Sequence, residues 1–379
     1  MRSIVGRLPL LVVLPLVFSA CARASTSPST GPSSAATAAS MATAKSASPS
    51  MSPAPSASTP PQVDGQIVFD DAGKDFEFSQ IWIENADGSN VRKLVTDDFT
   101  DAGPSLSPDG KHVVFYQASP ASLEEMLADP SLFGRIMLVN VDGSGLHELQ
   151  TGNRANRCDA GPEGDAWSPD GSRIAFARFC FDKAANFVGS GIWTINADGT
   201  DAREVTRTGP AKLRKDGTYA SHLEDHRASW SPDGKQLVFE RIDTSTTPES
   251  PAIFTIGING EGLRQVTPWK LDANDPVWSP DGSLIAFNSP AEPAHDQNIY
   301  TIHPDGTGLK KLTAYDEERQ ATFHPSWSPD GTQILFSHNP STDGWADFFV
   351  MNRDGSDLHI LAATTMHEDH AYWGGSPTP

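Results

Sequence analysis

The stretch Trp327-Ser328-Pro329-Asp330-Gly331 decides the fold, because it recurs along the chain. The same five residues begin at Trp167, Trp230 and Trp278, a copy with Leu in place of Trp begins at Leu106, and a degraded copy begins at Trp373. In each copy, proline sets the φ angle for the second position of a turn, aspartate tolerates the third, and glycine takes the positive φ that closes a hairpin. Each copy therefore predicts a tight turn between two strands.

The turns belong to a larger repeat. The unit that starts at Trp278 contains strand A with Trp278, strand B with Phe287, strand C at 299–302 and strand D at 310–313. The phenylalanines of successive B strands, from Phe69 to Phe336, are 46 to 63 residues apart. Repeats of four short strands at this period predict the blades of a propeller.

The two ends of the repeat complete each other. The first B strand, at 67–69, has no A strand before it, and the last A strand, near Trp373, has no B strand after it. Pairing these two strands would remove two open sheet edges. We therefore predict an all-β fold: a six-bladed β-propeller of four-stranded blades, whose ring is closed by N-terminal strands B to D joining a C-terminal strand A.

The repeated motif resembles the TolB-like propeller repeats, also called PD40 or WD40-like repeats, over about residues 66–377. The resemblance implies a propeller of the bacterial cell envelope that takes part in protein interactions. Related propellers also occur as parts of peptidases, and a few are enzymes themselves, so the fold alone does not determine the function.

The N-terminus has the pattern of a lipoprotein signal peptide over residues 1–20, with two arginines followed by an apolar run too short to span a membrane. The residues Phe18-Ser19-Ala20-Cys21 resemble a lipobox, which implies lipidation of Cys21. Cleavage near Ala20 that leaves a free thiol is the alternative interpretation. We expect a protein that is lipid-anchored to the cell membrane and faces its extracytoplasmic side, in the periplasm or outside the cell.

Residues 21–62 consist almost wholly of Ser, Ala, Thr and Pro, which predicts a disordered tether, and residues 63–379 form the predicted propeller. The first 62 residues contain four of the 28 basic residues and none of the 48 acidic ones, which leaves a net charge of −24 on the rest. That charge argues against nucleic acid as a partner and against membrane contact other than through the lipid. We expect a monomer that binds a protein or a small ligand.

Two cysteines lie at nearly equal distances before and after the Ser168–Gly171 turn. If the hairpin extends that far, Cys158 and Cys180 face each other across it, and a secreted context favours their oxidation. We predict a Cys158–Cys180 disulfide; two free thiols are the alternative.

The lengths of the connections distinguish the two faces of the propeller. The A–B and C–D turns are short and uniform, and the B–C and D–A connections are long and dissimilar. Because strands alternate in direction, the long connections must share one face. A rigid scaffold that presents variable loops on one face is the usual arrangement for binding, so we expect the long loops to form the functional face.

Carboxylates and imidazoles lie just ahead of the strand-A tryptophans, where they are expected to ring the mouth of the central channel. These candidate ligand-binding residues are Asp101, Asp165, Asp225, His226, Asp275, His324, Asp369 and His370. Such a ring suits a cationic ligand or a divalent metal, with His226, His324 and His370 as the metal ligands. The alternative is that these side chains pair with one another or with the loop backbone.

We predict a non-catalytic binding lipoprotein without a cofactor. The rival hypothesis is a metal-dependent lyase or hydrolase that acts on an extracellular glycan at the channel mouth, because some PD40-like lyases carry a histidine-bound metal there and Phe323-His324-Pro325 resembles their motifs. The sequence contains no Gly-x-Ser-x-Gly nucleophile elbow, no P-loop and no His-Glu-x-x-His motif.

Overall fold

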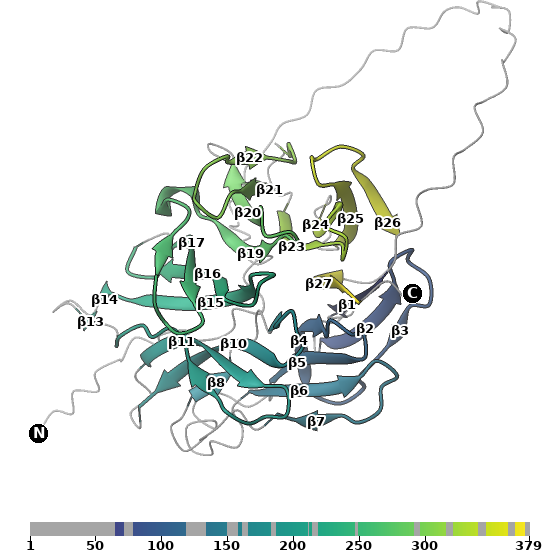
Figure 1. The fold of residues 1–379 in the computed structure, drawn as a ribbon, viewed down its shortest axis with the longest axis horizontal. Coiled ribbons are helices and arrows are strands. Elements are labelled where there is room, and N and C mark those ends of the chain that lie inside the picture. The colour runs from purple at the N-terminus through teal and green to yellow at the C-terminus, as the bar shows by residue number, and fades with distance from the viewer. Residues whose placement is uncertain are drawn as a thin grey trace, which may run out of the picture. The chain divides into compact units, whose positions relative to one another are not determined.

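The computed structural model describes residues 65–71, 79–118, 134–149, 158–160, 166–182, 187–210, 212–213, 219–246, 249–291, 296–315, 321–339, 346–362 and 368–375. Six sheets stand as blades around a central axis, so the predicted six-bladed, all-β propeller is confirmed (Figure 1). The described residues also include a single turn of 3-10 helix, η4 (Trp269–Leu271), between two strands. No helix in the described part of the chain has the length and apolar character needed to cross a membrane.

Each blade is an antiparallel sheet with its strands in the order A, B, C, D. Blade 1 contains β27 (Glu368–Gly374), β1 (Gln66–Asp71), β2 (Gln80–Asn85) and β3 (Arg92–Lys93). Blade 2 contains β4 (Thr100–Leu106), β5 (His112–Ala118), β6 (Arg135–Asn140) and β7 (His147–Glu148). In blade 3, β8 (Cys158–Ala160) and β9 (Ala166–Trp167) both pair with β10 (Arg173–Phe181), which is followed by β11 (Phe187–Asn196) and β12 (Arg203–Glu204).

The remaining blades repeat this order without interruption of strand A. Blade 4 contains β15 (Leu223–Trp230), β16 (Gln236–Asp243), β17 (Ser250–Gly257) and β18 (Arg264–Gln265). Blade 5 contains β19 (Asn274–Trp278), β20 (Ile285–Ala291), β21 (Asp296–Ile302) and β22 (Lys310–Lys311). Blade 6 contains β23 (Ala321–Trp327), β24 (Gln333–Asn339), β25 (Asp347–Asn352) and β26 (His359–Ala362). A small hairpin of β13 (Lys212–Leu213) and β14 (Tyr219–Ser221), which the sequence did not predict, lies between blades 3 and 4 in the chain.

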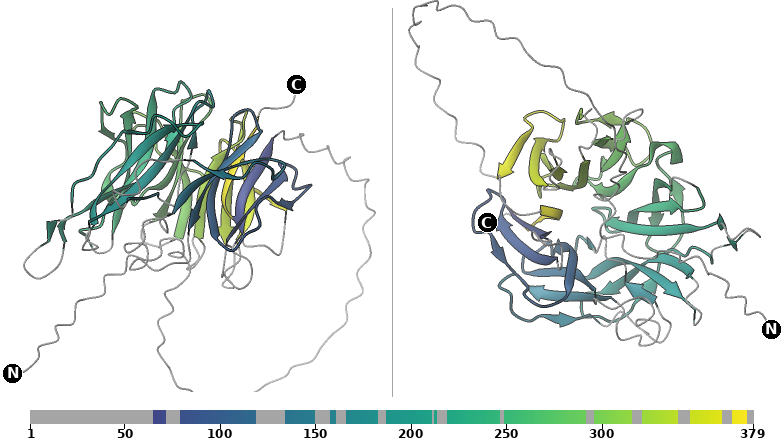
Figure 2. Two further views of the ribbon diagram at one scale, coloured as in Figure 1. Left: turned by 90° about the horizontal axis from the view of Figure 1, so that it is seen from below. Right: turned by 180° about the vertical axis from the view of Figure 1, so that it is seen from behind.

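The ring closes as predicted, because β27 near the C-terminus pairs with β1, with Trp373 opposite Ile67. Antiparallel pairing within each blade places all A–B and C–D turns on one face, called here the short-turn face. The B strands end and the C strands begin on the opposite face, called here the long-loop face. Seen from the side, the strands of all blades run between these two faces (Figure 2).

The Ser-Pro-Asp-Gly turns contact one another around the ring. In blade 6, Ser328 Oγ donates to Asp330 Oδ1 at 2.7 Å, and the Gly331 N–H donates to the Ser328 carbonyl at 2.8 Å. Gly331 has a φ of +69°, and a Cβ added there would lie 3.2 Å from Pro280 of the preceding blade. The glycine is therefore required both by its backbone conformation and by the packing of one blade on the next.

The repeated aromatic residues fill the space between blades. The B-strand phenylalanines are all fully buried: Phe69, Phe115, Phe176, Phe239, Phe287 and Phe336. Several strand-A tryptophans also bind the neighbouring blade, since Trp230 Nε1 donates to the Ala166 carbonyl at 3.0 Å and Trp167 Nε1 donates to the Ser105 carbonyl at 3.2 Å. The acceptor in each case is the residue just before the equivalent Trp or Leu of the preceding blade.

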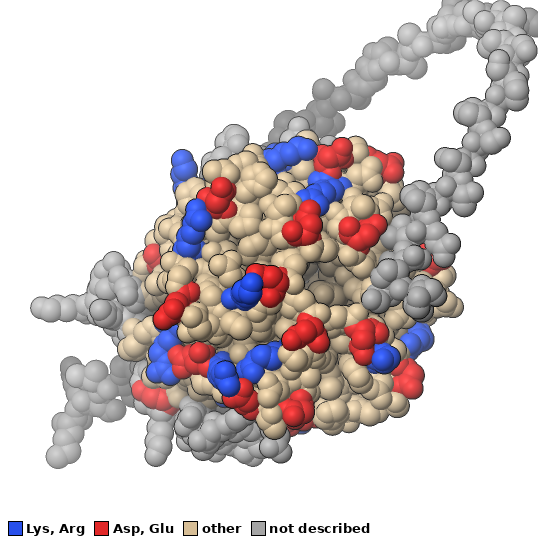
Figure 3. All heavy atoms as spheres, viewed as in Figure 1, with Lys and Arg blue, Asp and Glu red and all other residues tan. Residues whose placement is uncertain are grey.

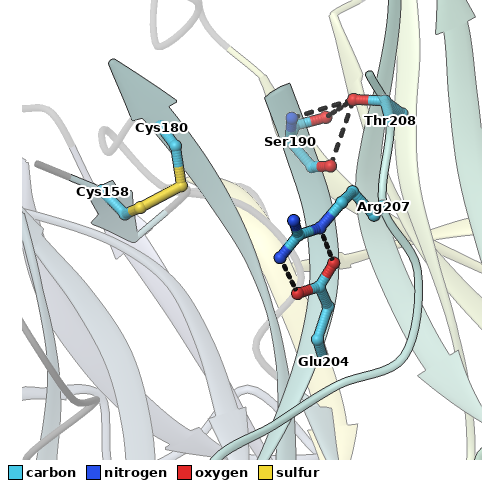
Figure 4. The surroundings of a disulfide bond; sticks show 6 residues. All are labelled: Cys158, Cys180, Ser190, Glu204, Arg207 and Thr208. Atoms are coloured by element: carbon cyan, nitrogen blue, oxygen red, sulfur yellow. Dashed lines mark hydrogen bonds and ion pairs between the residues drawn. A yellow bond between two sulfur atoms is a disulfide. The ribbon is translucent and has the colours of Figure 1, made fainter. Parts of the chain in front are cut away.

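The predicted disulfide joins Cys158 of β8 to Cys180 of β10, with an S–S distance of 2.07 Å (Figure 4). The two cysteines are direct partners in the β8–β10 pairing. On the neighbouring strand, the Ser190 N–H donates to Thr208 Oγ1 at 2.8 Å, which attaches the chain after β12 to β11. The disulfide thus holds the separate β8 piece of strand A against its blade.

Acidic and basic side chains are interspersed on the short-turn face, around a central hollow (Figure 3). Ion pairs on this face include Lys111 with Asp109, at 3.3 Å, and Arg353 with Asp281, at 2.7 Å. Most of these side chains are exposed, so the pairs contribute little to stability.

Two tryptophans in equivalent places test the contact between blades. Trp230 and Trp278 are about equally buried, but the Trp278 Nε1 has no hydrogen-bond partner among the described residues. Trp230→Phe removes the hydrogen bond to the Ala166 carbonyl, so we expect it to lower the free energy of unfolding by about 1 kcal/mol more than Trp278→Phe. Denaturant unfolding of the two variants measures the difference, and equal losses would contradict a role for the indole hydrogen bond.

Candidate site in the central channel

Strand A carries a β-bulge at the same place in blades 2, 4, 5 and 6, and the β27–β1 pairing of blade 1 also shifts register. The residue three positions before the Trp or Leu of each turn has a left-handed backbone. These residues are Gly103 (φ 59°), Arg227 (48°), Asp275 (54°), His324 (51°) and His370 (46°). A left-handed conformation is uncommon for residues other than glycine and is often found at functional sites. The bulges aim these residues at the central channel.

The five bulge residues line one cavity of about 120 Å³. Its other walls are largely apolar and include Pro104, Pro276, Pro325 and Tyr372. The cavity therefore combines charged and imidazole groups with apolar surface, as ligand sites commonly do.

A chain of polar contacts connects the bulge residues. The Arg227 guanidinium forms an ion pair with the Asp275 carboxylate, which is almost fully buried. The guanidinium also lies 2.9 Å from His324 Nε2. Because a guanidinium only donates, His324 Nε2 is the acceptor in this contact.

The chain of contacts continues through a second histidine into blade 1. The rings of His324 and His370 are stacked, with centroids 3.9 Å apart. His370 Nδ1 lies 3.0 Å from Asp70 Oδ1, which also accepts the Gly103 N–H at 3.2 Å. Residues from five blades thus meet in one polar network beside the cavity.

The sequence relationships agree with this architecture. A family model of the TolB beta propeller domain, PD40, matches residues 165–374. The chain belongs to this family. Its structure is similar to that of TolB from Acinetobacter baumannii, with a TM-score of 0.56 and 16% identity over 82% of this chain and 67% of that one. It is also similar to a putative TolB from Agrobacterium tumefaciens, with a TM-score of 0.53 and 18% identity over 83% of this chain and 91% of that one.

Two curated relatives are enzymes by name. Dipeptidyl-peptidase 5 of Porphyromonas endodontalis is 29% identical over 224 residues, which are 55% of this chain and 28% of the relative. Dipeptidyl-peptidase 5 of Porphyromonas gingivalis is 36% identical over 61 residues, which are 16% of this chain and 9% of the relative. This TolB-family chain therefore matches about a quarter or less of the length of these relatives.

The TolB-family propeller separates the eight candidate residues that the sequence placed in one ring. Asp275, His324 and His370 line the cavity, whereas Asp101, Asp225 and His226 do not. Asp369 lies in β27 opposite Asp70, and Asp165 and Cys21 lie outside the described residues. Asp101 and Asp225 do not line the cavity because they precede the bulge residue by two positions. His226 precedes it by one, so its side chain also has different surroundings.

Two residues of the cavity network were missed by the sequence analysis. Arg227 stands three residues before Trp230, as His324 stands before Trp327, so its spacing could have identified it. Asp70 follows the buried Phe69 in strand B and carries no such signal. It enters the network through His370 of the neighbouring strand β27 and through the Gly103 N–H of blade 2.

His226 belongs to a separate buried group. Glu224 lies between two imidazoles, with its Oε1 3.0 Å from His222 Nε2 and its Oε2 3.2 Å from His226 Nε2. Burial raises the pKa of Glu224, but the hydrogen bonds from both histidines outweigh it and lower that pKa to about 2. No three His, Cys, Asp or Glu side chains in the described part of the chain are grouped so as to hold a metal ion.

Asp225 and Asp101 are fully buried at equivalent positions of blades 4 and 2. Asp225 accepts hydrogen bonds from Arg241 Nε at 2.6 Å and Nη2 at 2.8 Å. Asp101 instead accepts one from the neutral amide of Gln117 at 3.0 Å. Burial above all, with the charges of Asp97 and Asp70, raises the pKa of Asp101 to about 8, against the opposing effect of the Gln117 hydrogen bond.

The raised pKa of Asp101 gives the stability of the protein a pH dependence. The folded protein keeps a proton on Asp101 that the unfolded chain releases near pH 4. This contribution to the free energy of unfolding is complete below about pH 4 and is lost as the pH rises to about 8. In metal-free buffer, we expect Asp101→Asn to show a smaller loss of stability between pH 5 and pH 8 than the wild type, as measured by urea unfolding. Parallel pH profiles would contradict this account.

Proposed function

We propose that this TolB-family chain is a non-catalytic binding protein, anchored at Cys21 to the extracytoplasmic side of the cell membrane. Its long-loop face binds an envelope or extracellular protein, or a small ligand, at the mouth of the central channel. The observation that carries the proposal is the set of polar residues held in the left-handed conformation around the cavity.

This conformation costs roughly 1–3 kcal/mol for each residue other than glycine. Gly103 makes the same bulge in blade 2 without that cost, so the fold alone does not require Arg227, Asp275, His324 and His370 at these positions. Their retention at a cost to stability is what a binding role would explain.

The chemistry of the cavity favours a ligand with both polar and apolar parts. Prolines supply an apolar wall, Arg227 offers donors, the imidazoles offer donors and acceptors, and the Asp275 carboxylate offers acceptors. A volume of about 120 Å³ accommodates one side chain or a small molecule rather than a nucleotide-sized cofactor. A segment of a partner protein that inserts a single side chain satisfies these conditions.

The topology fixes the face at which strand β1 begins. Strand β1 begins with Gln66 on the short-turn face, because A–B turns lie there and β1 is a B strand. The rival hypothesis, a metal-dependent lyase or hydrolase, has no comparable support among the described residues.

A paired set of histidine variants tests the proposal. His324→Asn together with His370→Asn removes both imidazoles, and asparagine tolerates the left-handed backbone. Immobilised protein would be used to recover partners from an envelope extract, and each purified partner would be titrated by calorimetry. We expect the double variant to bind at least about tenfold more weakly than the wild type, which corresponds to about 1.4 kcal/mol.

The matched control changes two histidines on the short-turn face, His147→Asn with His359→Asn. Both imidazoles are exposed and contact only a nearby carbonyl among the described residues, Gly145 or Asp357. We expect this control to bind as the wild type does. Equal affinity of the channel variant and the wild type for every recovered partner would refute the channel as the binding site.

A further inference from the structure

A pair of acidic side chains between blades 1 and 2 lacks the counter-charge that the same scaffold supplies elsewhere. Asp101 of β4 is fully buried, and Asp97 lies in the segment that leads from β3 to β4. The amide nitrogen of Gln117 donates to both carboxylates, to Asp97 at 2.8 Å and to Asp101 at 3.0 Å. The second carboxylate oxygen of Asp101 is buried and has no hydrogen-bond partner among the described residues.

Blade 4 shows what this position requires. Asp101 and Asp225 each stand five residues before the Leu or Trp of the turn, and each pairs in register with the residue two positions after a buried phenylalanine. In blade 4 that residue is Arg241, which forms two hydrogen bonds with Asp225. In blade 2 it is the neutral Gln117, so the buried Asp101 carboxylate has no cation at the equivalent position. An unpaired buried charge is costly and calls for compensation.

The nearest basic side chain does not supply the cation. Arg135 lies opposite Gln117 in β6, and its guanidinium stacks over the Phe99 ring at 4.8 Å. It forms no ion pair with Asp97 or Asp101 in the described structure. Its charge lowers the pKa of Asp101, but burial and the charges of Asp97 and Asp70 prevail.

The surrounding groups are hard oxygen donors. A half-turn of the Gln117 amide would present its oxygen where its nitrogen now bridges the two carboxylates. The Gln80 amide oxygen accepts the Asp97 N–H at 3.3 Å, and the Gln80 amide nitrogen donates to the carbonyls of Ser79 and Phe99, so further oxygens lie nearby. Carboxylate, amide and carbonyl oxygens in a flexible arrangement are the ligands that Ca²⁺ takes in proteins.

We propose that Asp97 and Asp101 form a calcium site between blades 1 and 2, in which Ca²⁺ takes the place that the Arg241 guanidinium takes beside Asp225. Asp97 is half-buried, which gives the ion a path from the solvent to the buried Asp101. The site lies next to the cavity network, because Ser79 donates to Asp70 at 3.0 Å and the Ser79 carbonyl accepts the Asp101 N–H at 2.9 Å. Bound calcium would therefore also fix the position of Asp70 beside His370.

Calorimetric titration of the full-length chain with CaCl₂ tests the site, together with thermal unfolding in CaCl₂, in MgCl₂ and in EDTA. We expect one calcium ion per chain, with a dissociation constant on the order of 10⁻⁴ to 10⁻³ M. We also expect millimolar calcium to raise the melting temperature by several degrees and magnesium to do so less, because Mg²⁺ demands a stricter octahedral geometry.

Two variants locate the site. Gln117→Arg reproduces the arrangement of blade 4, so we expect it to melt higher than the wild type in EDTA and to lose the response to calcium. Asp101→Asn removes the buried charge and is expected to lose the response as well. Asp354→Asn alters an exposed carboxylate of a C–D turn and should keep the full response. A wild type that does not bind calcium, or variants at Gln117 and Asp101 that bind it as the wild type does, would overturn the proposal.

Discussion

The structure depends on the packing of each blade against the next around a closed ring. A single four-stranded blade has two apolar faces and cannot bury both by itself, and every B-strand phenylalanine lies in an apolar cluster shared with the preceding blade. Tryptophans add hydrogen bonds across the same boundary, as Trp230 does to the Ala166 carbonyl. The ring has no free edge because β27 and β1, from opposite ends of the chain, complete one blade. Removing either end would expose the apolar faces of the first and last blades.

The same packing fixes the residues of the channel. Strand A carries both the tryptophan that binds the neighbouring blade and, three residues earlier, the bulge that faces the channel. Because the tryptophan and the turn hold one end of the strand, the bulge residue of each blade is held at a constant height in the ring. A scaffold constrained in this way can keep Asp275, His324 and His370 in a left-handed conformation that a free strand would abandon. The packing between blades therefore both makes the ring rigid and positions the residues of the site.

The repeat made most of the fold predictable, and the same repeat limited what could be predicted of the site. Turn chemistry at Ser328–Gly331 and the spacing of the phenylalanines are local signals, and they gave the number of blades, the strand order, the ring closure and the Cys158–Cys180 pairing. The separation of Asp225 and His226 from the cavity was not predictable, because it depends on a bulge that begins after His226. The partner of Asp225 is Arg241 of the neighbouring strand, and no local pattern in the sequence specifies that pairing.

Repetition also lets one blade serve as the reference for another. Asp101 and Asp225 occupy equivalent register positions but differ in their partners: Asp225 has the Arg241 guanidinium and the Thr206 hydroxyl, whereas Asp101 has the neutral Gln117 amide. Nearby, Glu224 shows a different solution, since two imidazoles surround its carboxylate. Buried carboxylates of this propeller are therefore compensated by guanidinium in one place and by imidazole in another. The neighbours of Asp101 offer oxygens and one neutral amide but no cation in contact, so its charge is removed by protonation below about pH 8 or compensated by an ion from solution.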